Sequence, residues 1–148
     1  MDGRGVTAAL CLGAGAAQMG TAFMLCPEAG TLPPHRRALA AASETDVATT
    51  TAVTGRLARG VRNRLMTTLR GHPVPPYPVM NALTSELRRV SAGRDDPEFM
   101  SLWCGQAAPL AAQQTAAETV RAIEKSLGTL ATRPHEMVIG SAAVGGAS

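Results

Sequence analysis

The chain is 148 residues long, which is enough for one domain with a buried core, and its formal net charge is only +3. A charge this small does not by itself indicate a nucleic-acid partner. Aromatic residues make up 3 % of the chain and Ala and Gly carry much of the apolar share, so the composition favours helices packed through small side chains. The wide spacing of Cys11, Cys26 and Cys104 indicates buried thiols in a reducing, cytoplasmic compartment, not disulfides or a zinc site.

The first segment contains an uncharged run, 6–27, of about 22 residues, nominally long enough to cross a bilayer. Its glycines and Gln18 dilute the hydrophobicity of the run. Asp2 and Arg4 leave no net positive flank ahead of it, as an export signal would require. We therefore expect neither a membrane segment nor an export signal here.

The same segment is better explained as the helix and strand of a βαβ unit. Asp2 can cap a helix over 3–12, and Gly13 is a suitable residue to end it. A short buried strand is then expected over 16–19, with Gly20-Thr21 as its exit.

The rest of the chain alternates helical and extended patterns. The predicted elements are a helix over 35–42 opened by two prolines, a polar turn over 43–46, an extended segment over 47–54, a loop over 55–60, a helix over 61–69, a proline-rich connection over 71–78, a helix over 80–90 and a turn over 93–96. Thr115 and Glu118 have capping-box spacing for a last helix, which Gly128 is expected to stop before a flexible tail over 131–148. One strand cannot form a sheet alone, so this inventory is incomplete for an α/β domain.

Several motifs in a fixed order resemble the late part of the nitronate monooxygenase (2-nitropropane dioxygenase) family. They are MDGRGVTAALCLGAGAAQMGTAFMLCPEAG at the start of the chain, ALAAASETD over 38–46, GRLARGVRNR over 55–64, PYPVMNALT over 76–84 and DPEFMSLWCGQ over 96–106. The similarity runs from residue 2 to about 127. It implies that residues 1–130 are the C-terminal fragment of an FMN-binding TIM (β/α)8 barrel, contributing its last helix–strand unit and further helices, mostly helical as an isolated chain.

The resemblance also implies a function, the oxidation of alkyl nitronates or nitroalkanes by dioxygen with FMN as cofactor. Gln18, Met19, Gly20 and Thr21 match the stretch that binds the flavin phosphate at the end of the eighth strand. This role suits the residues, because a glycine permits close backbone approach and the N–H groups of the following turn point at the anion.

Four further residues are near-site candidates on the same resemblance. Tyr77 and Asn81 could line the mouth of the flavin site, although simple packing also explains them. Trp103 and Gln106 stand where the family has a similar Trp-x-Gly-Gln, with packing of the last helices on the barrel as the alternative.

The family's catalytic histidine falls in a part of the fold that these residues do not match, so the chain is expected to lack the catalytic base. His35, His72 and His135 are not its counterparts and are expected to be solvated. The alternatives are a non-catalytic remnant or mis-called start, possible association with a separate chain carrying the rest of the barrel, and an FMN-dependent enoyl-carrier-protein reductase-like enzyme.

Two surface features complete the expectations. Five arginines lie in a region without acids: Arg56, Arg59, Arg62, Arg64 and Arg70. Because aromatic residues are not interleaved with them, we interpret them as pairing and capping groups of a surface loop and not as a nucleic-acid site. Val6, Leu10 and Phe23 are expected to form an exposed apolar patch.

Overall fold

The structure is a computed structural model that describes residues 2–131, to which every structural statement below refers. The elements in chain order are α1 (Gly3–Cys11), α2 (Thr21–Met24), α3 (Pro33–Ala41), the 3-10 turn η1 (Glu44–Asp46), β1 (Val47–Thr50), β2 (Ala58–Val61), α4 (Arg64–Thr68), α5 (Val79–Gly93), the 3-10 turns η2 (Pro97–Phe99) and η3 (Ala108–Leu110), and α6 (Ala116–Ala131). The described part of the chain is therefore mostly helical with one small two-stranded sheet, as the sequence predicts.

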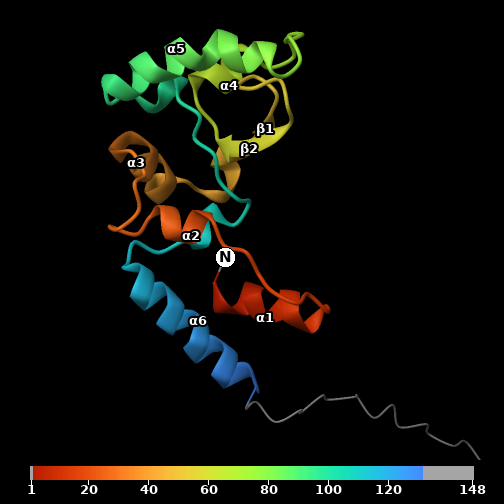
Figure 1. Cartoon of the computed structure of the whole chain (residues 1–148), viewed down its shortest axis with the longest axis vertical. Coiled ribbons are helices and arrows are strands. Elements are labelled where there is room, and N and C mark those ends of the chain that lie inside the picture. The colour runs from red at the N-terminus through yellow and green to blue at the C-terminus, as the bar shows by residue number, and fades with distance from the viewer. Residues whose placement is uncertain (1, 132–148) are drawn as a thin grey trace, which may run out of the picture.

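The elements form an elongated arrangement (Figure 1). Helices α1 and α6 lie at one end, α4, α5 and the β1–β2 hairpin lie at the other, and α2 and α3 lie between them. The buried cluster occupies the middle and draws residues from segments far apart in the sequence. Its members are Leu25, Leu39, Val61, Met100, Leu102 and Ala108. The central core is thus built where α2, α3, β2 and the chain after η2 meet.

The first helix forms as predicted. The Asp2 carboxylate accepts a hydrogen bond from the backbone N–H of Gly5 at 3.1 Å, which caps α1. Helix α1 packs on α6 so closely that a Cβ on Gly3 would lie 2.2 Å from the Cβ of Ser126. Val6 is buried, contrary to the exposed patch expected from the sequence, because it lies on a helix that packs on α6, whereas Leu10 is 39 % exposed.

The strand predicted over 16–19 is wrong. Residues 12–20 form an irregular connection between α1 and α2. A strand requires a neighbour that pairs with its backbone N–H and C=O groups, and the described residues place none beside this segment. The apolar pattern over 16–19 therefore does not form a strand within the described residues.

The described sheet is an antiparallel hairpin in which Val47 of β1 lies opposite Val61 of β2. The extended segment predicted over 47–54 is confirmed for its first half, but the loop predicted over 55–60 is wrong because β2 begins within it. The prediction of a loop relied on Gly60, because glycine is common in loops. A Cβ at this position would lie 2.6 Å from the carbonyl oxygen of Leu102, so the glycine permits a close backbone approach within a strand.

The helix predicted over 61–69 begins three residues later, because Asn63 is its N-cap. The Asn63 Oδ1 accepts from the backbone N–H of Met66 at 3.2 Å. Its Nδ2 donates to the carbonyls of Pro97 and Met100, each at 2.9 Å. The side chain is buried, so one amide both starts α4 and holds the η2 segment beside it.

The other predicted helices are confirmed with shifted ends: α3 begins at the prolines and α5 extends beyond 80–90 on both sides. The capping box is present, since the Thr115 Oγ1 accepts from the N–H of Glu118 at 3.2 Å and the Glu118 carboxylate accepts from the N–H of Thr115 at 2.8 Å. The stop at Gly128 is wrong. A glycine within a helix costs only about 1 kcal/mol relative to alanine, and α6 continues to Ala131. Residues 132–148 of the predicted tail lie outside the described residues.

The burial of the cysteines and histidines differs in part from the expectation. Cys26 is buried as predicted, Cys104 is half-buried, and Cys11 is exposed because it ends α1 on an uncovered surface. His72 is exposed as predicted, His35 is buried, and His135 lies outside the described residues. Within residues 2–131, no helix combines the length and apolar character needed to cross a bilayer.

Replacing Asn63 with Asp should lower the free energy of unfolding by about 3 kcal/mol, because a carboxylate cannot donate to the Pro97 and Met100 carbonyls and both lose a buried partner. Urea denaturation followed by circular dichroism measures this. Asn81→Asp is the matched control, since the Asn81 Oδ1 accepts from Arg88 and an aspartate retains that role. Equal stability of the two variants would contradict the assignment.

Candidate functional site

A cavity of about 450 Å³ opens between α2, the hairpin and the chain after η2. We call it the Trp103 cavity. Its lining residues are Gly20, Thr21, Met24, Thr54, Ala58, Arg59, Trp103 and Cys104. The volume lies within the range typical of small-molecule sites, and the walls combine an aromatic ring, a hydroxyl, a guanidinium and the first turn of a helix.

The segment 102–105 forms one wall of the Trp103 cavity and is attached to β2 through its backbone. The N–H of Val61 donates to the Leu102 carbonyl at 2.8 Å, and the N–H of Cys104 donates to the Arg59 carbonyl at 3.1 Å. Gly60 and Trp103 form the isolated bridge between these two bonds. The segment therefore acts as a short third strand, which fixes where the indole ring stands.

Two side chains attach the same segment to the helices. The N–H of Gly105 donates to the Thr21 Oγ1 at 2.8 Å, which links the segment to the start of α2. The His35 Nε2 lies 3.1 Å from the Trp103 carbonyl oxygen, which links it to α3. A carbonyl can only accept, so Nε2 carries the proton of the neutral ring. Burial lowers the pKa of His35 and outweighs the opposite effect of this hydrogen bond, which keeps the imidazole neutral.

The start of α2 provides donors on the opposite wall. The first bonds accepted by the Gly20 carbonyl come from Phe23 and Met24, so the N–H of Thr21, which lines this wall, precedes the hydrogen-bonded part of the helix. Ala22 is buried and lines a hollow between α1 and α6 instead. A Cβ on Gly20 would have no atom within 4 Å, and this glycine borders open space. The Thr21 Oγ1 accepts from Gly105 and keeps its own proton for donation.

These donors fit the phosphate end of a flavin mononucleotide. A phosphate oxygen accepts hydrogen bonds from N–H and hydroxyl groups, and the cavity offers both beside the positive charge of Arg59. Cys104 is unsuited to nucleophilic chemistry, because partial burial raises the pKa of its thiol and the opposing charge of Arg59 does not compensate. The described residues contain no cluster of His, Cys, Asp and Glu able to hold a metal ion.

The structure places the four residues predicted to bind the phosphate in different surroundings. Gly20 and Thr21 line the Trp103 cavity. Met19 lines the hollow between α1 and α6, and Gln18 is exposed. Their phosphate-binding role stays a prediction, and the contacts within the described residues favour Gly20 and Thr21.

The near-site candidates are also separated. Trp103 lines the cavity named after it, and Gln106 lines a second cavity on the hairpin. Tyr77 stands before α5 with its ring 4.4 Å from the guanidinium carbon of Arg56. Asn81, on α5, accepts from Arg88 at 2.8 Å. Neither Tyr77 nor Asn81 lines either cavity, so the interactions present here are packing and pairing.

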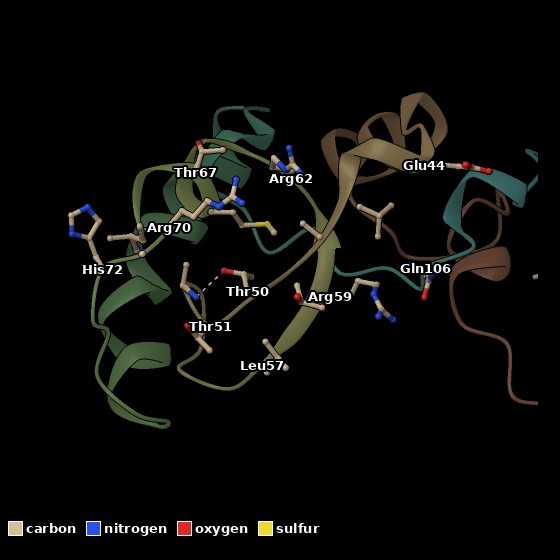
Figure 2. A pocket seen from close by; sticks show the side chains of 17 residues that line it. Glu44, Thr50, Thr51, Leu57, Arg59, Arg62, Thr67, Arg70, His72 and Gln106 are labelled. Atoms are coloured by element: carbon tan, nitrogen blue, oxygen red, sulfur yellow. Dashed lines mark hydrogen bonds between the residues drawn. The ribbon is translucent and has the colours of Figure 1, made fainter.

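The second cavity lies along the β1–β2 hairpin and has a volume of about 660 Å³ (Figure 2). We call it the basic cavity. Three arginines, Arg59, Arg62 and Arg70, line it together with Gln106 and a single carboxylate, Glu44. Arg59 borders both cavities.

Two site residues were missed from the sequence. His35 was expected to be solvated, and no local pattern shows that its ring meets a residue 68 positions later. Arg59 was grouped with its neighbours as a loop residue, but in the structure it lies in β2, directly before Gly60. Only the pairing of distant segments reveals both roles.

The sequence profile of the family described as "Nitronate monooxygenase" matches residues 1–125. The nitronate monooxygenase of Pseudomonas aeruginosa is 42 % identical over 130 residues, which cover 86 % of this chain and 37 % of that protein. A probable nitronate monooxygenase of Staphylococcus haemolyticus is 36 % identical over 134 residues, covering 89 % of this chain and 38 % of that protein. The chain belongs to the nitronate monooxygenase family, and it spans little more than a third of the length of these relatives.

Solved structures agree with the assignment. The nitroalkane oxidase from Streptomyces ansochromogenes matches with a TM-score of 0.84 and 36 % identity, over 89 % of this chain and 38 % of that one. FabK from Thermotoga maritima matches with a TM-score of 0.73 and 27 % identity, over 88 % of this chain and 42 % of that one. The fold of this chain is therefore similar to a part of each of these larger structures.

Replacing His35 with Leu should lower stability by about 2 kcal/mol, because the Trp103 carbonyl loses its donor. His35→Gln, which can place an amide N–H near the same point, should restore most of the loss. Thermal denaturation of both variants measures this.

The pKa of His35 also predicts a pH dependence. The unfolded histidine titrates near its ordinary value of 6.5 and the folded one lower, so the unfolded state binds the proton first as pH falls. Stability contributed by neutral His35 is complete above about pH 6.5 and declines between that pH and the lower folded pKa. The difference in melting temperature between wild type and His35→Gln, recorded against pH, should change in this window. A constant difference would contradict the assignment.

Proposed function

We propose that this chain provides the flavin-phosphate end of an FMN-dependent nitronate monooxygenase built as a (β/α)8 barrel. The observation that carries the proposal is the meeting of the α2 start with the Trp103 wall around one cavity, through the Gly105–Thr21 hydrogen bond. Membership of the nitronate monooxygenase family supports the reaction class, an oxidoreductase acting on nitronates with dioxygen.

In this proposal the residues of the chain bind, orient and exclude water. The N–H and hydroxyl groups of Thr21 bind phosphate oxygens. The indole of Trp103 covers one side of the cavity and keeps water out. Arg59 places a positive charge where an anionic nitronate would be attracted. FMN, when bound, supplies the electron-accepting chemistry.

The residue that would remove a substrate proton is proposed to come from the part of the relatives that this chain does not span. His35 cannot serve, because its Nε2 is engaged by the Trp103 carbonyl and its ring is buried. His72 lies on the basic cavity and not on the Trp103 cavity. Two activities are thus distinct in this proposal. This chain binds the cofactor, whereas turnover requires a complete barrel, formed in one chain or with a separate chain.

A second candidate is a flavin enzyme of the enoyl-carrier-protein reductase class. The similarity of this chain to FabK supports this second candidate. The nitroalkane oxidase shows both the higher identity and the higher TM-score, which favours the first candidate. Dioxygen consumption with propane-2-nitronate, against reduction of an enoyl thioester, separates the two reaction classes.

FMN binding by the full chain tests the proposal, with quenching of flavin fluorescence as the measurement. Thr21→Val should weaken binding about tenfold, because it removes a donor to the phosphate and the anchor of Gly105. Thr21→Ser should bind like the wild type. Thr68→Val, on the exposed side of α4, is the matched control. A chain that is folded and does not quench FMN at about 100 µM would overturn the proposal and favour the non-catalytic alternative.

A further inference from the structure

We propose that the basic cavity is a second binding site, separate from the flavin site, which takes the phosphate group of a small aliphatic phosphate ester. The cavity lies along the hairpin on residues that the FMN proposal does not use, Arg59 excepted.

The charge of the lining is unbalanced. Three guanidinium groups face one carboxylate, that of Glu44, which leaves an excess of two positive charges. The salt bridges of the described residues are Arg4–Asp2, Arg37–Asp95 and Arg89–Glu86, so none involves a cavity arginine. Positive groups that outnumber the nearby carboxylates in a concave surface create a potential that attracts anions.

The other arginines of the same region do have partners. Arg56 stacks over the ring of Tyr77, and Arg64 lies 5.7 Å from the ring centre of Phe99. The charge of Arg62 also helps to lower the pKa of Asp46, but the Asp46 carboxylate accepts its hydrogen bonds from the N–H and hydroxyl of Ser43. Arg56 and Arg64 thus have aromatic partners, whereas Arg59, Arg62 and Arg70 line the basic cavity.

Two of the cavity arginines lie toward one end of the cavity. Arg62 follows β2 and Arg70 follows α4, and their side chains extend toward the same end of the cavity in Figure 2. Arg59 lies at the other end beside Gln106, and the ring of His72 points away from the cavity. Guanidinium groups bind phosphate oxygens through paired N–H donors, so the end between Arg62 and Arg70 is where a phosphate fits.

The rest of the lining indicates what the phosphate carries. Ala52 and Met66 are buried and Leu57 is exposed at the rim, which together offer an apolar surface to an aliphatic group. Thr50 and Thr51 line the same cavity and offer hydroxyl groups to the phosphate end. No Phe, Tyr or Trp is among the lining residues, so a nucleobase would find no ring on which to stack. A volume of about 660 Å³ admits a small ester and is too confined for a polymer.

Isothermal titration calorimetry of the full chain with monobutyl phosphate tests the proposal, with inorganic phosphate as the second probe. Monobutyl phosphate should bind saturably and more tightly than inorganic phosphate. Arg62→Gln and Arg70→Gln should each weaken its binding about tenfold. Glu44→Gln should strengthen it severalfold, because it removes the one lining carboxylate.

Arg121→Gln is the charge-matched control, since Arg121 lies on α6 at the far end of the molecule (Figure 1). It should bind monobutyl phosphate as the wild type does. The opposite effects of the arginine and glutamate substitutions separate binding from misfolding, because a folding defect would weaken binding in both. Equal affinity of Arg62→Gln, Arg70→Gln and wild type, as binding at the Trp103 cavity would produce, overturns the proposal, and so does absence of saturable binding.

Discussion

The attachment of residues 102–105 to β2 is the constraint on which the rest of the structure depends. Two backbone hydrogen bonds give this segment a strand-like course, and Gly60 permits the approach. Once the course is set, the Trp103 carbonyl meets His35 and the Gly105 N–H meets Thr21. Helices α2 and α3 are thereby tied to the hairpin, and the central buried cluster closes between them.

The same constraint produces both cavities. Because the segment runs along one side of β2, its indole wall faces the start of α2, while the hairpin leaves the basic cavity along β1 and α4. Arg59 belongs to β2 and borders both. A single strand thus connects a region suited to a flavin phosphate with a second region of positive charge. A substitution in β2 would alter both cavities, whereas a substitution of Arg62 or Arg70 would alter the basic cavity alone.

Local sequence signals predicted the helices well and the strands poorly. Capping groups such as Asp2 and the Thr115–Glu118 pair act within one turn, so their helices could be located from neighbouring residues alone. The strand over 16–19 failed because pairing partners are needed and none is described there. Thr21 and Trp103 were chosen separately from the sequence as candidate site residues. That they line the same cavity depends on contacts between distant segments, such as the hydrogen bond from Gly105 to Thr21.

By itself the sequence determined the family, through ordered motifs that the family profile and the relatives match, and it determined which segments could be helical. Only the tertiary structure decided that His35 is buried on the Trp103 carbonyl, that Gly60 is a strand residue, and that three of five arginines surround a cavity. The physical reason is range. Capping and helix propensity act over a few residues, whereas burial, strand pairing and charge excess depend on segments that only folding brings together.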